Sequence, residues 1–161
     1  MANSSIIDDI KTKVVNILLT DPTIVKAMNV PYDDIDDLVG KNIFTFSQNP
    51  NVITDSETFI TIQVHIPKSS TVSTTWVHPI LEMWIISHNK HMKVLDMPRV
   101  RANRNDLLSQ LIDEKLNGRD DFGYGQMFLQ RNIEGVHPDN RDYLYRQLVF
   151  ETKDLSKPVC R

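Results

Sequence analysis

The chain has 161 residues, enough to bury a substantial hydrophobic core, and we expect a single α+β domain over residues 1–155 followed by a polar tail at 156–161. No apolar run approaches the roughly 20 residues of a membrane span, so a membrane protein is not expected. The formal net charge of −3 argues against a globally basic surface for nucleic acid.

The only cysteine, Cys160, excludes an internal disulfide and a metal site built from several cysteines. It stands beside the C-terminus, where we expect a surface thiol and not a catalytic thiolate. The first residues lack the basic and apolar regions of a secretion signal, which predicts synthesis and folding in the cytosol.

Helical spacing of apolar residues, among them Ile6, Ile10, Val14 and Ile17, predicts a first helix over residues 4–20. The pair Asp21 and Pro22 follows, a capping residue before a proline at the first helical position, and predicts a short second helix ending near Val30.

The acidic stretch YDDIDDLVG at residues 32–40 predicts one more short helix, with Ile35, Leu38 and Val39 turned inward. Its aspartates lack the alternating oxygen donors, the central glycine and the closing glutamate of a calcium-binding loop. We therefore expect a solvated acidic face made by four residues: Asp33, Asp34, Asp36 and Asp37.

Two strands are predicted next, after a loop or short strand within residues 41–56. Residues 57–66 alternate between apolar and polar side chains, as in a strand with one buried face. Residues 79–87 are apolar on both alternating sets, which indicates a central strand covered on both faces. The long polar connection between them runs from Lys68 to Trp76, and long loops on rigid sheets often contact partners.

The second of these strands is followed by two histidines, His88 and His91, whose spacing would let one metal ion bind both on a helix. No third ligand is evident, so an exposed polar connection is favoured and no cofactor is expected. The arginines that follow are able to bind phosphate or carboxylate groups, and the scarcity of basic neighbours favours carboxylates of a partner subunit. They are Arg99, Arg101 and Arg104.

Residues 103–118 predict the helix that closes the core, with Asn103 as its cap, Asp106 completing a weak capping box, and Asn117-Gly118 as a left-handed stop. We expect Leu111→Asp to disrupt the fold. The apolar stripe of this helix consists of Leu107, Leu108, Leu111, Ile112 and Leu116.

Beyond this helix, Gly123 and Gly125 indicate a turn without the spacing of a phosphate-binding loop. Residues 126–133 and 143–152 alternate on either side of a break and predict a second hairpin. The expected fold is α+β: a mainly antiparallel four-stranded sheet of two hairpins, with helices packed on one face.

Four segments in residues 81–155 follow one another in a recognisable order: WIISHNK, RANRNDLLSQLIDEKLNG, GYGQMFLQRN and YLYRQLVFETKDL. This order resembles the tail-terminator or tail-completion (head-tail joining) proteins of tailed bacteriophages. The resemblance implies a structural protein and not an enzyme. Its copies, usually six, would form a ring at the head-proximal end of the tail, ending tube growth and joining the tail to the head connector.

The implied partners are copies of the chain itself, the tail-tube protein and the head-connector or neck protein, with DNA passing through the lumen without specific binding. The implied location is the tail or neck of the virion, and the host cytoplasm during assembly. Within such a ring, we hypothesise that Arg99 and Arg101 of one copy meet the acidic stretch of the next.

Three alternatives remain open at this point. The first is a head-closing adaptor of the connector, which shares the size and assembly logic. The second is a small metal-dependent enzyme that uses His88 and His91 with Asp96. The third is a monomeric adaptor that binds a partner through the Trp76 loop.

Overall fold

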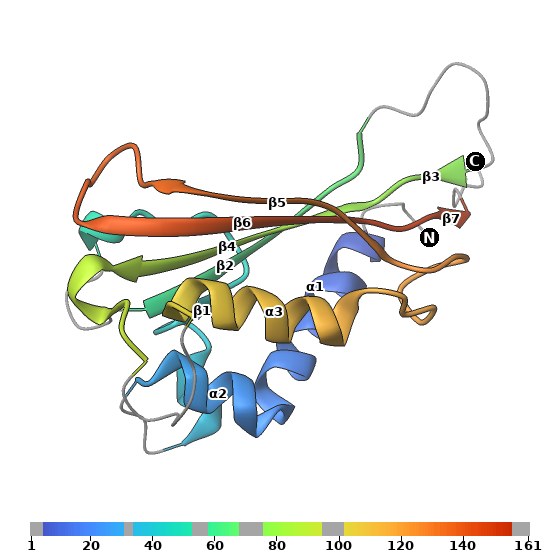
Figure 1. The fold of residues 1–161 in the computed structure, drawn as a ribbon. Coiled ribbons are helices and arrows are strands. Elements are labelled where there is room, and N and C mark those ends of the chain that lie inside the picture. The colour runs from blue at the N-terminus through green and yellow to red at the C-terminus, as the bar shows by residue number, and fades with distance from the viewer. Residues whose placement is uncertain (1–4, 31–33, 53–57, 68–75, 95–101, 156–161) are drawn as a thin grey trace.

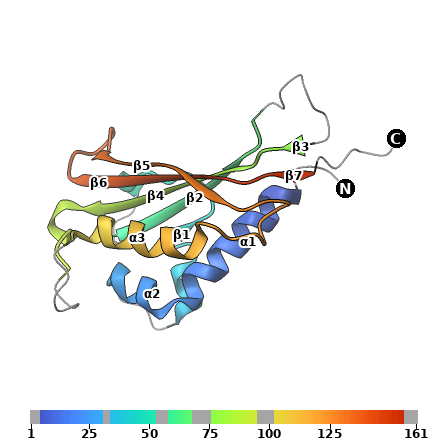
Figure 2. The same cartoon turned by 45° about the vertical axis from the view of Figure 1, so that its right-hand side comes forward.

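The computed structural model describes residues 5–30, 34–52, 58–67, 76–94 and 102–155. One layer of helices lies against one face of a β-sheet, and the other face carries none of the three α-helices (Figures 1 and 2). The helical elements are α1 (Ser5–Thr20), α2 (Pro22–Met28) and α3 (Arg104–Leu116), with short 3-10 turns η1 (Ile35–Leu38), η2 (Pro50–Val52) and η3 (Asn89–His91).

The main sheet has five strands in the order β1-β2-β4-β6-β5, and a separate two-stranded ribbon pairs β3 with β7. The α+β class and both predicted hairpins are confirmed, but the prediction of four strands is wrong, because β1 joins the sheet in parallel with β2. The strands are β1 (Ile43–Phe44), β2 (Thr58–His65), β3 (Trp76–Val77), β4 (Ile80–His88), β5 (Phe128–Val136), β6 (Tyr143–Glu151) and β7 (Asp154–Leu155).

The N-terminal helices follow the predicted spacing, with the buried positions of α1 repeating every four residues from Ile6 to Leu18. Asp21 Oδ1 caps α2 by accepting hydrogen bonds from the backbone N–H groups of Thr23 (2.8 Å) and Ile24 (3.2 Å). Asn29 ends α2 in the left-handed conformation, which asparagine tolerates better than most residues.

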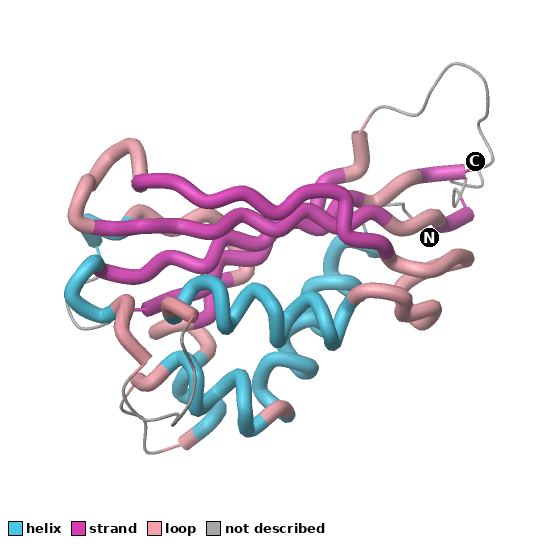
Figure 3. Tube along the Cα trace, in the orientation of Figure 1, coloured by secondary structure: helices cyan, strands magenta, loops and turns pink. Residues whose placement is uncertain are grey.

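Helix α3 closes the core as predicted, because it packs on β4 and β6 while α2 lies beneath it (Figure 3). Asn103 Oδ1 accepts a hydrogen bond from the N–H of Asp106 (2.9 Å), which confirms the cap. Asn117 is extended and Gly118 is left-handed (φ 82°). The left-handed stop predicted for Asn117-Gly118 is therefore made by the glycine alone.

The apolar stripe of α3 is unequally buried. Leu108, Ile112 and Leu116 have no exposed surface, whereas Leu107 and Leu111 flank the core and are partly buried. Disruption by Leu111→Asp stays a prediction, and a larger effect is expected at Leu108, because its side chain is buried completely.

Strand β4 is central, as predicted, between β2 and β6. Strand β2 was expected to bury one face, and this is wrong, because Phe59 and Thr61 on its other face are also buried. Phe59 packs there in a second apolar cluster on the side of the sheet away from the helices, together with Phe44, Ile86 and Tyr143.

Two short segments also differ from expectation. In the acidic stretch only Leu38 turns inward, while Ile35 and Val39 are 42% and 44% exposed. At the C-terminal end, Asp154 and Leu155 form a strand where a polar end was expected, whereas the predicted tail at 156–161, including Cys160, lies outside the described residues.

None of the helices in the described part of the chain has both the length and the apolar character needed to cross a bilayer.

Candidate assembly surfaces

Several residues singled out in the sequence lie outside the described part of the chain, so their positions are not assigned. They are Asp33, Lys68, Asp96, Arg99 and Arg101. The structure does place Asp34, Asp36, Asp37, Trp76, His88, His91 and Arg104.

Arg104 does not face a partner, because its side chain is only 2% exposed and is used inside the fold. Its guanidinium donates hydrogen bonds to three backbone carbonyl oxygens, those of Ala27 (2.5 Å), His91 (2.7 Å) and Lys93 (2.9 Å). Ala27 lies in the last turn of α2, where a positive charge also interacts favourably with the helix dipole. The prediction that Arg104 binds external carboxylates or phosphates is wrong.

The two histidines are held in separate environments. Thr58 Oγ1 lies 2.7 Å from His91 Nδ1, and Asn29 Nδ2 lies 3.5 Å from His91 Nε2. His88 Nδ1 accepts a hydrogen bond from the N–H of Lys90 (3.2 Å), and its ring packs edge-on against Tyr143. Across the described residues no group of three or more His, Cys, Asp or Glu side chains is close enough to hold a metal ion.

His91 belongs to a buried polar network that no sequence pattern indicated. Thr58 Oγ1 also lies 3.0 Å from Ser87 Oγ, which donates to Asn105 Oδ1 (2.7 Å). Asn105 Nδ2 in turn donates to the carbonyl oxygen of Leu144 (3.1 Å). This network joins β2, β4, α3 and β6, so its polar groups fix the position of α3 on the sheet.

The helix-free face of the sheet carries a polar and aromatic group centred on Glu82. Its Oε1 accepts hydrogen bonds from Trp84 Nε1 (2.7 Å) and from Gln147 Nε2, and its Oε2 lies 3.4 Å from His65 Nε2. The Trp84 ring packs against Tyr145, with centroids 4.6 Å apart. The Glu82 carboxylate is thus engaged within the sheet face itself.

A hollow of about 340 Å³ lies beside this group, bordered by Gln48 on one side and His137 on the other. Burial lowers the pKa of His137, and the nearby Asp139 opposes that shift. The ring accepts a hydrogen bond at Nδ1 from the N–H of Asp139 (3.3 Å). His137 therefore holds the turn between β5 and β6 in place.

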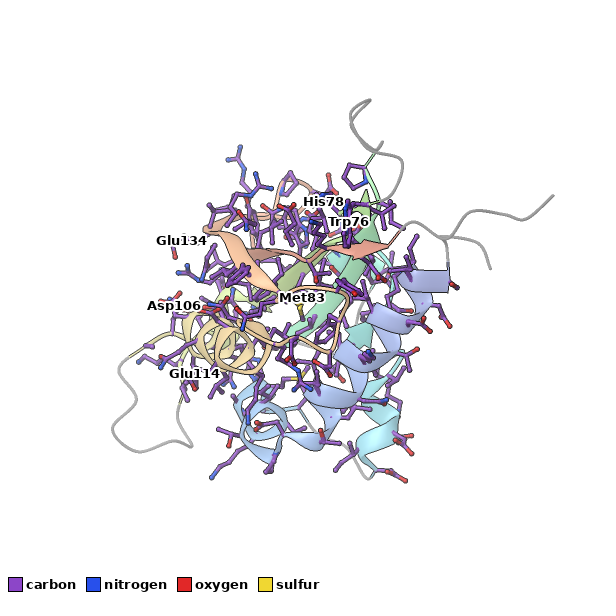
Figure 4. All side chains as sticks on the ribbon, turned by 90° about the vertical axis from the view of Figure 1, so that its right-hand side faces the viewer. Trp76, His78, Met83, Asp106, Glu114 and Glu134 are labelled. Carbon is purple, nitrogen blue, oxygen red and sulfur yellow. The ribbon has the colours of Figure 1, made fainter. Side chains whose placement is uncertain are left out.

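Strand β5 forms one edge of the sheet and is exposed along most of its length. Phe128, Ile133 and Val136 are 50%, 41% and 51% exposed, which is high for large apolar side chains on a strand. The strand is tied to its neighbours by Arg146, which donates to Glu134 Oε2 (2.9 Å) and pairs with Asp106 of α3. Figure 4 shows Glu134 and Asp106 on the same side of the molecule.

At the opposite edge the outermost residue is Val39, which forms an isolated parallel bridge with Ile43 of β1. The acidic turn η1 precedes it, and there Asp37 pairs with Lys41 (3.1 Å). No ion pair within the described residues involves Asp34 or Asp36. A groove of about 200 Å³ between α1 and this edge includes Val39 in its lining.

Trp76 lies on the β3-β7 ribbon, near His78, as Figure 4 shows. The Lys153 ammonium stands 3.9 Å from the centre of the Trp76 ring, and the Tyr124 ring packs edge-on against it. The ribbon therefore presents an ordered aromatic group beyond the main sheet, instead of the loop residue that the sequence suggested.

Comparison with known proteins adds a family and a fold. A family model described as YomW matches residues 16–152. A chain in the structure of the virion of a native gene transfer agent (GTA) particle matches this chain with a TM-score of 0.56 and 11% identity, over 89% of this chain and 92% of that chain. At that identity the likeness is one of fold. Comparison with curated protein sequences gives no match.

Proposed function

Because the chain belongs to the YomW family, a phage-derived family, we propose that it is a structural protein of a virion that acts as a tail terminator. The family assignment bears out the resemblance to phage structural proteins, and the finer role is our proposal. The observation that supports it most is the fold shared, over 89% of the chain, with a chain of a virion particle.

In this role, copies of the chain form a closed ring, of six subunits, at the head-proximal end of the tail. The ring contacts the tail-tube protein on one side and the head connector on the other, and DNA passes through its lumen without specific binding. The protein resides in the tail or neck of the virion and in the host cytoplasm during assembly. No step of this function requires a bound cofactor.

The contacts between subunits use charges of opposite sign. Arg99 and Arg101 of one copy face the acidic stretch of the next, while Lys68 and the Trp76 ribbon contact a neighbour. The exposed state of Asp34 and Asp36 supports this arrangement, because neither forms an ion pair within the described part of its own chain. The acidic members of this contact are Asp33, Asp34, Asp36 and Asp37.

Removal of the gene from its phage, followed by electron microscopy, tests the terminator role. We expect tails of uncontrolled length that do not join heads, and antibody against the chain should label the head-proximal end of wild-type tails. Normal joined particles without the chain would refute the role. Labelling of heads that lack tails would assign the chain to the head-closing adaptors instead.

A further inference from the structure

Two exposed surfaces lie at the opposite ends of the strand order. The β5 rim consists of Phe128, Arg131, Ile133 and Val136, all on the edge strand β5. The η1 rim consists of Asp34, Ile35, Asp36 and Val39, beside the edge strand β1.

Both rims expose large apolar side chains. Five of the eight large hydrophobic residues that are exposed in the described chain belong to the rims: Ile35, Val39, Phe128, Ile133 and Val136. Phe46, another of the eight, packs on Phe44 of β1. Exposed apolar surface of this kind often marks a site of contact with another protein.

The charges of the two rims are opposite. Arg131 projects from the β5 rim, and none of the ion pairs in the described residues uses it. Asp34 and Asp36 of the η1 rim form no ion pair with any described residue. A basic group within one apolar surface and acidic groups within the other give the complementarity that orients two partners.

The backbone adds a further asymmetry. The outer side of β5 has no neighbouring strand in the described sheet, so its free N–H and C=O groups are available to a partner. The opposite edge ends in a two-residue strand and the groove beside Val39, about 200 Å³ in volume. A cavity of about 150 Å³ is enough to hold a benzene ring, so this groove has room for one side chain of a neighbour.

We infer that the β5 rim of one copy binds the η1 rim of a second copy, so that Arg131 meets Asp34 and Asp36, and the contact of Arg99 and Arg101 proposed above is left to Asp33 and Asp37. The two surfaces differ and lie on opposite edges, so the contact is heterologous and each copy keeps one free rim for the next. Repetition of this contact gives a ring when the rotation between neighbouring copies closes. The inference rests on the proposed ring-forming function and names the surfaces that form the ring.

Cross-linking of single-cysteine chains tests the contact, with Cys160→Ser as the background. Val39→Cys and Ile133→Cys are prepared separately, and both positions are exposed enough to accept the change. A short bis-maleimide should join the two variants when they are mixed and should join neither variant to itself. Gln110→Cys on the exposed side of α3 replaces Ile133→Cys as the matched control and should give no product with Val39→Cys.

A charge exchange tests the orientation. Arg131→Glu should lower the apparent affinity between copies, and with it the cross-linked yield, roughly tenfold, because like charges would then face each other. Asp34→Lys with Asp36→Lys in the partner chain should restore the yield. Arg141→Glu, an exposed arginine outside both rims, is the control and should have little effect.

Absence of product from the Val39 and Ile133 mixture would overturn the inference, as would self-linking of either variant. Equal effects of Arg131→Glu and Arg141→Glu, or no rescue by the lysines, would overturn it as well. Mass spectrometry of purified particles separates this failure from that of the proposed function. A chain present in particles without the cross-link refutes the contact alone, whereas a chain absent from particles refutes the virion role.

Discussion

Strands β4 and β5 each have nine residues and belong to the same sheet, yet they are built for different surroundings. In β4 the residues that face the helices, Leu81, Met83 and Ile85, are buried completely or nearly so. In β5 the apolar residues Phe128, Ile133 and Val136 are exposed to solvent. The difference shows that burial of apolar surface stabilises the centre of this chain, while the same kind of surface remains available at its edge.

Two features account for this difference: the helices cover the Met83 side of β4, and β5 lies at the edge of the sheet with Phe128 and Ile133 on the face away from the helices. Helix α3 packs on β4 and β6, and Met83 of β4 points into the core between sheet and helices (Figure 4). Strand β5 is joined to the body by its ladder with β6 and by the Arg146 pairs. Substitutions in the two regions should therefore separate stability from assembly.

The largest effect is expected for Leu108→Asp, which places a charge without a partner in the cluster that backs β4. The free energy of unfolding should fall by at least about 4 kcal/mol, as for other buried charges. Leu111→Asp is the matched control on the same helix, and the charge should cost clearly less at this partly buried site. Urea unfolding followed by circular dichroism measures both, and equal losses would contradict the burial pattern of α3.

A smaller loss is expected for Ile85→Ala in β4, about 2–5 kcal/mol, because the removed methyl groups leave a cavity. Ile133→Ala in β5 removes the same groups from an exposed site and should cost less than about 1 kcal/mol in the isolated chain. It should nevertheless weaken contact between copies. Thermal denaturation of the two variants compares them directly, and equal shifts in Tm would remove the distinction between centre and edge.

Arg104→Lys should lower the free energy of unfolding by about 1–3 kcal/mol, because a lysine cannot reach all three carbonyl oxygens that the guanidinium serves. Because the Arg104 side chain is buried, the substitution should change the stability of the fold and not the contact between copies. Differential scanning calorimetry measures the loss. A lysine variant as stable as the wild type, but defective in assembly, would restore the reading of Arg104 as a partner-binding residue.

Asp21 gives a smaller effect than Arg104. The ion pair with Lys115 (2.7 Å) lowers the pKa of Asp21 in the fold, so this contribution is complete above the unfolded pKa, near 4, and is lost as pH falls through the lower folded value. Asp21→Ala should cost about 1 kcal/mol at neutral pH because the cap of α2 is removed. Asp21→Asn keeps a capping oxygen and should cost less.

Urea titrations at several pH values check this assignment. The difference in stability between the wild type and Asp21→Asn should shrink as the pH falls below about 4, because protonation removes the charge that the variant lacks. A difference that stays constant down to the acid transition would show that the ion pair with Lys115 does not stabilise the fold.

Periodicity and capping chemistry predicted the long elements well. Helix α3 was identified by its apolar stripe and by Asn103, and β4 by apolar residues on both alternating sets. Both signals arise from many residues and are reinforced by burial in the structure. Strand β1 has two residues, too few to show any period, and the burial of Phe59 depends on a cluster that forms only when β1, β2, β4 and β6 meet.

The candidate assembly surfaces were less predictable, because they depend on contacts between segments that are distant in the sequence. Arg104 follows the cap of α3 and looks like any surface arginine in the sequence, and only the approach of α2 makes its three acceptors available. Ile35 and Val39 suggested an inward face, but η1 is a short 3-10 turn and directs only Leu38 to the core. The exposure of β5 depends on its place at the end of the strand order, which alternation alone does not give.

Hydrogen exchange of β5, measured in the isolated chain and in the assembled particle, tests the central claim most directly. Amides of residues 131–136 that have no strand partner should exchange rapidly in the isolated chain and become protected on assembly, because a neighbouring copy covers this edge. Amides of β4 should be protected in both states. Equal exchange of β5 in the two states would contradict the assignment of this edge to assembly.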